Sequence, residues 1–281
     1  MNEPICLFDS GIGGLTVLKK LLEKFPNEGY IYLADLANVP YGDKTKEAIE
    51  EIAKNNIEWL SKFNPKLIIM ACNTSSTVLC EENRTTSVPT VPLYGMIQSL
   101  AKEISKSKYK KITVWATKLV IENNGYKNAI NILNPDIKVE EIACPKLVPM
   151  IEGIDPNLTD KKRIIKEYLK QTSEDSQALI LGCTHYPLIQ EEISKLTDMK
   201  IVDPAEALVS EVQKSGSPEV LRSEHINLLT SRPQDLQTSG PVLKKITFYT
   251  TAQKEKVEKF ANIYLCGNHK VNTVDLKKII V

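Results

Sequence analysis

The chain has 281 residues, 42% of them hydrophobic and 25% charged, which is the composition of an ordinary globular protein with two compact domains or one large one. Its formal net charge of +1 gives no field that would attract nucleic acid or an anionic membrane, so neither is expected as a partner. No apolar run approaches the ~18 residues of a transmembrane helix, and no basic region precedes the first apolar stretch, so we expect neither a membrane span nor a signal peptide. The six cysteines form no C-x-x-C pair and are expected to be free thiols in the cytoplasm.

The first predicted elements are a strand at 5–9 and a helix at 15–25, joined by a glycine-rich turn. The turn is not a dinucleotide fingerprint, because Thr16 stands where the third glycine belongs, and it lacks the Gly-Lys of a phosphate loop. Asp9 and Ser10 lie at the carboxyl end of the strand, beside a helix N-terminus whose free N–H groups can bind an anion. The turn therefore predicts an anion site with a carboxylate next to it.

Strands and helices alternate through the rest of the chain. Apolar stretches predict strands at 30–35, 66–71, 111–117, 138–143, 178–182 and 200–203, and in the tail at 245–251 and 271–276. Helical patterns cover 46–63, 118–130, 160–170 and 252–265, a cap and helix follow at 183–196, and 144–153 is a loop that opens a helical turn. Residues 88–96 are expected to be a strand with a crossing loop, and 215–242 to be the least regular stretch. The alternation predicts an α/β fold with mainly parallel sheets.

A weak internal repeat relates two of these strands. Residues 67–76 read LIIMACNTSS and residues 178–187 read ALILGCTHYP, so each apolar strand ends in a cysteine followed by polar residues. The similarity is either chance or the trace of two related lobes, and we predict two pseudo-symmetric α/β lobes, one of 1–94 plus 208–281 and one of 95–207. Because ligands bind outside the carboxyl ends of strands in open α/β sheets, both cysteines would face the cleft between the lobes.

Two thiols on opposite sides of a cleft suit the racemisation of an amino acid. A racemase removes the proton from one face of a carbon and returns a proton to the other face, so it needs a base and an acid that exchange roles with direction. Cysteine, with a reference pKa near ~8.5 that a helix N-terminus or a cation lowers, can serve in either role. Hydrogen bonds to the substrate carboxylate would stabilise the carbanion-like transition state. Neutral donors occur at these turns: Ser10, Asn73, Thr74 and Thr184.

Seven blocks of the sequence together resemble the glutamate racemase family. In order and spacing they read FDSGIGGLTV, YLAD with VPYGDK, ACNTSS, ATKLVIENNGY, ACPKLVPMIEG, LILGCTHYPLI and VDPAEAL, and the resemblance extends from residue 5 to about residue 212. Each block alone is weak, whereas the combination is specific. Glutamate racemases are cofactor-independent two-thiol enzymes that make D-glutamate for peptidoglycan, on which cell wall biogenesis and cell shape depend.

The resemblance implies a role for each matching residue. Cys72 and Cys183 would be the two bases, with Cys72 acting on the D-enantiomer and Cys183 on the L-enantiomer. Asp9 would assist Cys72, and Glu152 and His185 would assist Cys183. The substrate would be bound by Ser10, Pro40, Tyr41, Gly42, Asn73, Thr74, Thr117 and Thr184. The resemblance also implies a cytoplasmic isomerase, expected to be a homodimer, that acts on a small amino acid without a cofactor or a metal.

Three other hypotheses stay open. An aspartate racemase of the same superfamily would use the same thiols in a shorter pocket. A hydrolase or transferase would need only one cysteine nucleophile with His185 and would form a covalent intermediate. A binding protein could have kept the pocket and lost catalysis, because Val120 and Asn123 stand where the family usually has hydroxyl residues and Gln98 lies near the position of a usual proline.

The remaining cysteines and histidines have no such flanking residues. We expect Cys6, Cys80, Cys144 and Cys266 to be structural and His225 and His269 to lie at the surface. His185 has no further ligands at recognisable metal-site spacing. Asp9 and Glu152 could each serve only as a helix cap, and the charged stretches 46–56 and 252–260 are expected to be solvated helix faces.

Overall fold

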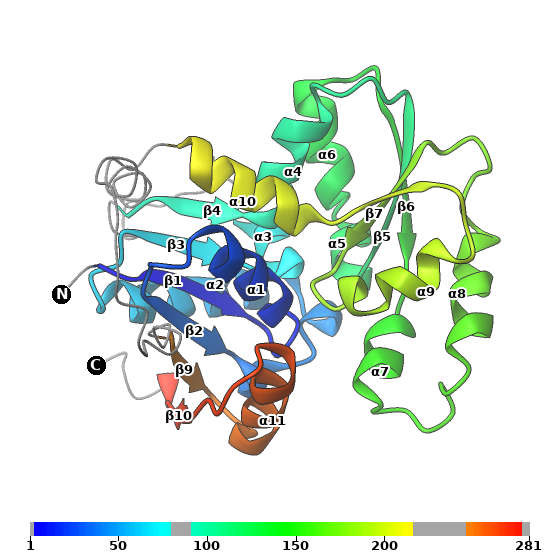
Figure 1. The fold of residues 1–281 in the computed structure, drawn as a ribbon. Coiled ribbons are helices and arrows are strands. Elements are labelled where there is room, and N and C mark those ends of the chain that lie inside the picture. The colour runs from blue at the N-terminus through cyan, green and yellow to red at the C-terminus, as the bar shows by residue number, and fades with distance from the viewer. Residues whose placement is uncertain (1–2, 80–90, 216–245, 277–281) are drawn as a thin grey trace, which may run out of the picture.

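The computed structural model describes residues 3–79, 91–215 and 246–276, and within these ranges it contains two sheets in which every pair of neighbouring strands is parallel (Figure 1). The six-stranded sheet contains, in spatial order, β10 (Val271–Thr273), β9 (Ile246–Thr250), β2 (Tyr30–Ala34), β1 (Ile5–Asp9), β3 (Leu67–Met70) and β4 (Leu93–Gly95). The four-stranded sheet contains β6 (Lys138–Ala143), β5 (Lys111–Ala116), β7 (Ala178–Gly182) and β8 (Lys200–Val202). Each sheet is the centre of one lobe, which confirms the predicted fold class.

Helices connect the strands and cover the sheets. The described α-helices are α1 (Leu15–Lys24), α2 (Lys46–Ser61), α3 (Asn73–Val78), α4 (Met96–Ile104), α5 (Lys118–Glu122), α6 (Gly125–Leu133), α7 (Leu147–Glu152), α8 (Lys161–Leu169), α9 (Gln190–Ser194), α10 (Pro204–Lys214) and α11 (Lys254–Tyr264). Short 3-10 turns occupy Leu36–Asn38, Tyr41–Asp43 and Tyr186–Ile189. In the parts of the chain that the structure describes, no helix is long and apolar enough to span a bilayer.

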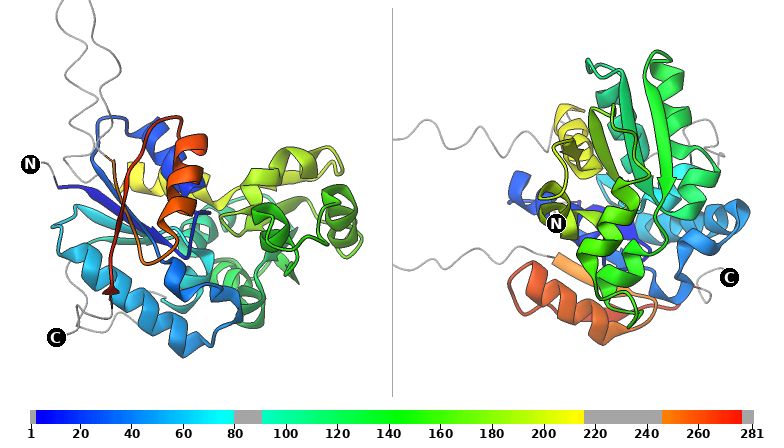
Figure 2. Two further views of the ribbon diagram at one scale, coloured as in Figure 1. Left: turned by 90° about the horizontal axis from the view of Figure 1, so that it is seen from below. Right: turned by 90° about the vertical axis from the view of Figure 1, so that its right-hand side faces the viewer.

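The central strand β1 is buried on both faces, which explains its uninterrupted apolar sequence. Its side chains alternate between two cores because successive Cβ atoms point to opposite faces of a sheet. Ile5 and Leu7 pack with residues of α1, α10 and α11, whereas Cys6 and Phe8 pack with residues of α2 on the other face. Figure 2 shows the corresponding layers, with α2 on one side of the first sheet and α1 and α11 on the other.

The two sheets repeat one strand order. In the first sheet the first four strands of the chain lie in the order β2-β1-β3-β4, and in the second sheet the next four lie in the order β6-β5-β7-β8. In both cases the order is second, first, third and fourth, which agrees with the repeat seen in the sequence. Cys72 follows β3 and Cys183 follows β7, so the two thiols occupy equivalent positions. The exact lobe boundaries, at 94/95 and 207/208, stay a prediction.

Two helices that the sequence patterns did not identify, α4 and α10, pack against each other where the lobes join. Met96 and Leu208 belong to the core of the first sheet, whereas Ile97 and Ala207 belong to the core of the second. The two helices thus tie both cores together. A signal for α10 was available, because Asp203 caps it by accepting a hydrogen bond of 3.0 Å from the backbone N–H of Ala205.

Several predicted boundaries are wrong for local reasons. The single helix expected at 118–130 is divided into α5 and α6, because Asn124 adopts a left-handed conformation (φ 49°) that Asn tolerates better than most residues. The helix expected within 183–196 begins as the 3-10 turn Tyr186–Ile189 and continues as the short α9. Nearly all of the stretch 215–242 lies outside the described residues.

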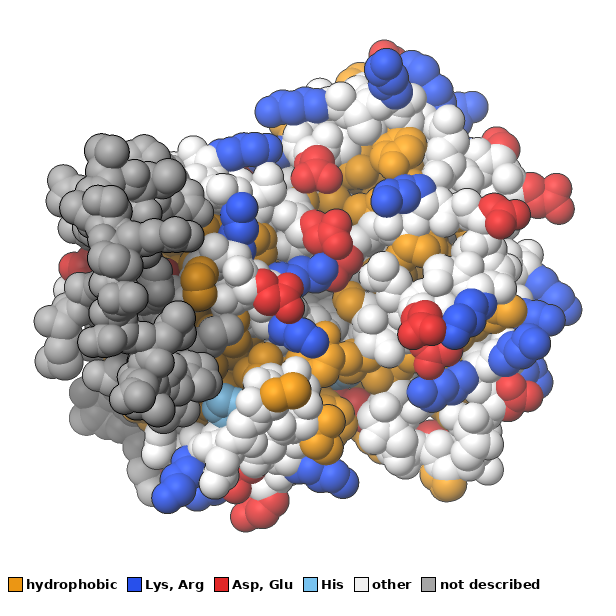
Figure 3. Space-filling view, viewed as in Figure 1, with side chains coloured by type: hydrophobic (Ala, Val, Ile, Leu, Met, Phe, Trp, Pro, Cys, Tyr) orange, Lys and Arg blue, Asp and Glu red, His pale blue; other side chains and the backbone are white. Residues whose placement is uncertain are grey.

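Charges of both signs are interspersed on the surface. On the face in Figure 3, Lys and Arg side chains alternate with Asp and Glu side chains over both lobes. This agrees with the formal net charge of +1.

Replacing Leu208 by Ala tests the role of α10 in joining the cores. Leu208 is fully buried, so Leu208→Ala is expected to lower the free energy of unfolding by about 2–5 kcal/mol, measured by urea denaturation. Lys214→Ala at the exposed end of the same helix is the control, with an expected change within about 0.5 kcal/mol. A loss for Leu208→Ala as small as that of the control would contradict this packing role.

Candidate active site

The carboxyl ends of the first and third strands of the two sheets meet at one place. Asp9 is the last residue of β1, and the Thr184 side chain, which follows β7, donates a hydrogen bond of 3.2 Å to its Oδ1 atom. The hydroxyl groups of Thr74 and Thr117, which follow β3 and β5, lie 3.1 Å apart. Both contacts join the lobes, so the polar residues after these four strands form a single cluster.

The glycine-rich turn after β1 docks directly against the turn that carries Cys183. A Cβ atom on Gly13 would lie only 2.3 Å from Thr184 Oγ1 and 2.6 Å from His185 Nδ1, so only glycine fits there. Thr16 Oγ1 donates to the backbone carbonyl of Thr184 at 3.1 Å. Thr16, which stands where a dinucleotide fingerprint has its third glycine, therefore makes a contact between the lobes.

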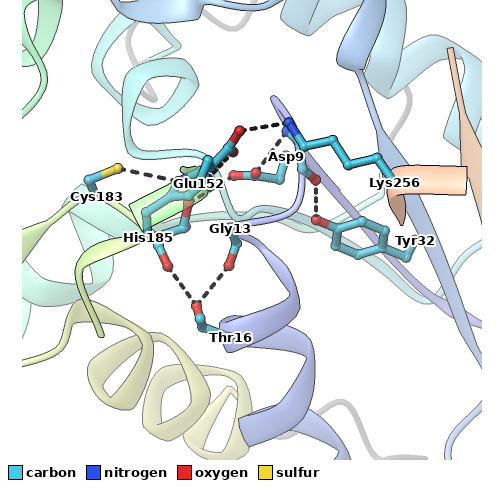
Figure 4. Close-up of polar contacts among 10 residues, drawn as sticks. Asp9, Gly13, Thr16, Tyr32, Glu152, Cys183, His185 and Lys256 are labelled. Carbon is cyan, nitrogen blue, oxygen red and sulfur yellow. Dashed lines mark hydrogen bonds and ion pairs between the residues drawn. The ribbon is translucent and has the colours of Figure 1, made fainter. Parts of the chain in front are cut away.

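Four side chains form a row that ends at Cys183 (Figure 4). His185 Nδ1 lies 3.8 Å from Cys183 Sγ, and its Nε2 lies 2.7 Å from Glu152 Oε1. The other carboxylate oxygen, Oε2, accepts a hydrogen bond of 2.7 Å from Lys256 Nζ. The structure thus brings together Cys183, His185 and Glu152, as the sequence predicted, and adds Lys256.

The charges in this row stabilise one another. Burial alone would lower the pKa of His185, but Cys183 and Glu152 raise it to about 10. Burial alone would raise the pKa of Glu152, but His185 and Lys256 lower it to about 2. His185 is therefore an imidazolium at neutral pH, and it lies beside the sulfur of Cys183.

Cys72 has a different environment. Burial, the charge of Asp9 and the charge of Cys183 raise the pKa of the Cys72 thiol to about 12, and hydrogen bonds from Ser75 oppose the rise. Cys72 precedes α3 as its N-cap, so Asn73, Thr74 and Ser75 lie inside the helix. A neutral Cys72 and a cationic His185 beside Cys183 make the two thiols unequal in the structure without substrate.

Asp9 is fully buried beside both thiol environments. Burial raises its pKa, whereas the charge of His185 and the backbone N–H groups of Gly11 and Gly14 lower it. Gly11 donates to Asp9 Oδ2 at 2.9 Å, so the carboxylate binds the turn that leads into α1.

Asn73 offers a free donor in the same cluster. Its Oδ1 atom accepts a hydrogen bond from the hydroxyl of Tyr126 in the other lobe. Its Nδ2 atom is buried and has no hydrogen-bond partner among the described residues. An unpaired buried amide donor is costly, so this atom is suited to bind an acceptor on a ligand.

The loop that contains Pro40, Tyr41 and Gly42 is held by a second buried carboxylate. Asp35 Oδ2 accepts from the Tyr41 hydroxyl at 2.5 Å, and its Oδ1 accepts from Thr251 at 2.8 Å. A Cβ atom on Gly42 would lie 3.3 Å from Thr117 Cβ, so this loop also reaches the other lobe. Pro40 is exposed.

The site is nearly closed to solvent. The exposed fractions are 5% for Cys72, 7% for Cys183, 0% for Asp9 and 5% for His185. Ser10, next to Asp9, is half-buried. Low exposure removes water from the surroundings of both thiols and strengthens each charge interaction among them.

Several expectations need correction. Glu152 is the last residue of α7 and does not open it, and Lys256 lies in a stretch that was expected to be a solvated face. Cys266 is exposed, and His269 is half-buried with its ring against Phe248. Cys6 and Cys144 are buried as expected, whereas Cys80 and His225 lie outside the described residues.

Three residues depart from the family pattern, and the structure gives the surroundings of each. Val120 is fully buried in the core of the second sheet, and Asn123 Nδ2 donates to the carbonyl of Leu119 at the end of α5. Gln98 donates to the carbonyl of Ser76 at 2.8 Å. Among the described residues there is no cluster of three or more His, Cys, Asp or Glu side chains that could hold a metal ion.

The similarity to known proteins agrees with this geometry. A family model described as Asp/Glu/hydantoin racemase matches residues 12–212. The chain belongs to this racemase family. The glutamate racemase of Fusobacterium nucleatum is 38% identical over 261 residues, which cover 92% of this chain and 94% of that protein. The glutamate racemase of Lactobacillus helveticus is 36% identical and covers 98% of this chain and 99% of its own length. The resemblance drawn from the seven sequence blocks is confirmed.

Solved racemase structures share the fold. The crystal structure of glutamate racemase from Francisella tularensis, in complex with D-glutamate, superposes with a TM-score of 0.81 at 31% identity and covers 99% of both chains. The aspartate racemase of Picrophilus torridus has a TM-score of 0.59 at 18% identity over 76% of this chain, and at that identity it shares the fold alone. The two-lobed racemase fold is therefore established for this chain.

Replacing Glu152 by Gln tests the charge row. Without the carboxylate, the pKa of His185 is expected to fall below about 10, because one of the two groups that raise it against burial is lost while Cys183 remains. Histidine ring resonances followed by NMR from pH 5 to 10 report this directly, since the chain has three histidines. The exposed Glu191→Gln is the control. A wild-type His185 ring that deprotonates near pH 6.5 would contradict the account.

Proposed function

We propose that the protein interconverts L- and D-glutamate by proton transfer at Cα between Cys72 and Cys183. The observation that carries the proposal is the equivalent placement of the two cysteines after the third strand of each sheet. They are near enough for the charge of Cys183 to raise the pKa of Cys72. Membership of the racemase family and the glutamate racemases among its relatives support glutamate as the substrate.

In one direction, the thiolate of Cys183 takes the Cα proton of L-glutamate and the thiol of Cys72 donates a proton to the opposite face. In the other direction, Cys72 takes the proton from D-glutamate and Cys183 donates one. Asp9 would assist Cys72, and Glu152 and His185 would assist Cys183. The assignment of faces follows the family resemblance, whereas the need for two complementary groups follows from the inversion itself.

The neutral donors of the cluster would bind the substrate. The free Nδ2 atom of Asn73 is suited to a carboxylate oxygen of the amino acid, and fixed donors there would stabilise the negative charge that develops during deprotonation. The other proposed substrate-binding residues are Ser10, Pro40, Tyr41, Gly42, Thr74, Thr117 and Thr184. No step of this mechanism uses a cofactor or a metal.

We infer that the enzyme supplies D-glutamate for peptidoglycan synthesis and so for cell wall biogenesis and cell shape. We further propose that it acts in the cytoplasm as a homodimer, with lobes of residues 1–94 plus 208–281 and 95–207.

Circular dichroism of purified protein with each amino acid tests the proposal. L-Glutamate is expected to lose its optical activity as the racemate forms, at a rate at least about 100-fold above that for L-aspartate, and dialysis against EDTA should not change the rate. The preference for glutamate over aspartate would come from the length of the side chain. Groups placed to bind the distal carboxylate of glutamate would be left unpaired by the shorter side chain of aspartate. Faster turnover of aspartate would favour the aspartate racemase hypothesis. A covalent adduct without racemisation, detected by intact mass, would favour the hydrolase or transferase hypothesis.

A further inference from the structure

The tail of the chain contributes a cation to the environment of Cys183. Lys256 lies on α11, which belongs to the first lobe, whereas Glu152 lies on α7 and Cys183 follows β7 in the second lobe. We infer that Lys256 is a positioning residue that acts across the lobes: it holds Glu152 so that His185 faces Cys183. The inference rests on the proposed function, and it assigns to the tail a part in only one of the two proton transfers.

The first support is geometric. Glu152 has two carboxylate oxygens, and each is 2.7 Å from a different cation, His185 Nε2 and Lys256 Nζ. With both oxygens engaged, the carboxylate has one orientation, and it is the orientation that places His185 Nδ1 3.8 Å from Cys183 Sγ. In Figure 4, Lys256 and Cys183 lie on opposite sides of Glu152 and His185.

The second support is burial and charge. The side chain of Glu152 is 8% exposed and that of Lys256 is 26% exposed, so this ion pair is partly shielded from water, unlike an ordinary surface pair. Along the row an ammonium, a carboxylate and an imidazolium alternate in sign up to the sulfur of Cys183. Without Lys256, the carboxylate would keep one partner and gain rotational freedom.

The third support is the anchoring of α11. Val257, the next residue after Lys256, is fully buried in the core of the first sheet. The segment before α11 is fixed by Thr250, whose hydroxyl donates to the carbonyl of Ala34 at 3.0 Å. Lys256 therefore extends from a well-anchored part of the first lobe, and its contact with Glu152 joins the two lobes.

The test separates the two proton transfers with a substrate that needs only one. In β-chloroalanine, removal of the Cα proton sends the C–H electron pair into a Cα=Cβ bond and expels chloride, and the resulting 2-aminoacrylate hydrolyses to pyruvate and ammonia. The L-enantiomer reports on Cys183 and the D-enantiomer on Cys72. Cys72→Ser, which should still eliminate from the L-enantiomer, and Cys183→Ser, which should still eliminate from the D-enantiomer, calibrate this assignment.

Lys256→Met is expected to slow elimination from β-chloro-L-alanine about tenfold or more, because misplacement of a reacting group costs that much. Elimination from the D-enantiomer should stay within about twofold of wild type. Glutamate racemisation should fall in both directions, since each turnover uses both thiols. Lys256→Arg should restore most of the L-elimination rate, and Lys259→Met, an exposed position of the same helix, should behave as wild type.

Three results would overturn the inference: equal loss for both enantiomers, no loss for either, or a raised KM for glutamate with unchanged elimination. The last result would mean that Lys256 binds the distal carboxylate of glutamate, a group that β-chloroalanine lacks. If the wild-type protein racemises glutamate and Lys256→Met gives one of these results, only the inference about Lys256 fails and the proposed function stays intact. A wild-type protein that neither racemises glutamate nor eliminates chloride refutes the proposed function itself. Thermal melts of all variants identify any loss of folding.

Discussion

The active-site cluster depends on one constraint, the meeting of two parallel sheets at the carboxyl ends of their strands. Parallel strands all end at the same edge, so the polar residues that follow them gather there. In this chain the edge of one sheet faces the edge of the other, and close contacts such as Thr184 with Asp9 and Thr74 with Thr117 join them. Gly13 makes the approach possible, because a Cβ atom at that position would overlap the opposite turn.

The same constraint makes the two thiols equivalent in topology but different in chemistry. Cys183 has a cationic partner in His185, held by Glu152, whereas Cys72 has the carboxyl group of Asp9 nearby and a pKa raised to about 12. A reversible racemase needs one base and one acid at the start of each turnover. Under the proposed function, the unequal surroundings of Cys72 and Cys183 would supply that difference for L-glutamate before it binds.

Much of this arrangement could be predicted from the sequence. The features that could not be predicted depend on contacts between residues far apart in the chain. Apolar strands and the repeated cysteine positions are local patterns, so the fold class followed from them, whereas the pairing of Cys183 with His185 was implied by the family resemblance. Local patterns did not reveal the helices α4 and α10 or the role of Lys256. Lys256 lies in a charged amphipathic helix and looks like any solvated lysine, because its role depends on Glu152, 104 positions away. Long-range contacts of this kind leave no local signal.

The most direct measurement of the central claim, two opposed proton-transfer groups, is the position of solvent deuterium during the first turnovers. L-Glutamate is incubated in D₂O, and the Cα isotope of each enantiomer is followed by chiral separation and mass spectrometry. With two opposed thiols, newly formed D-glutamate is expected to carry deuterium while the remaining L-glutamate keeps its protium, because the proton is taken by one thiol and replaced from the other. D-Glutamate that retains the original protium would indicate a single base and would contradict the account.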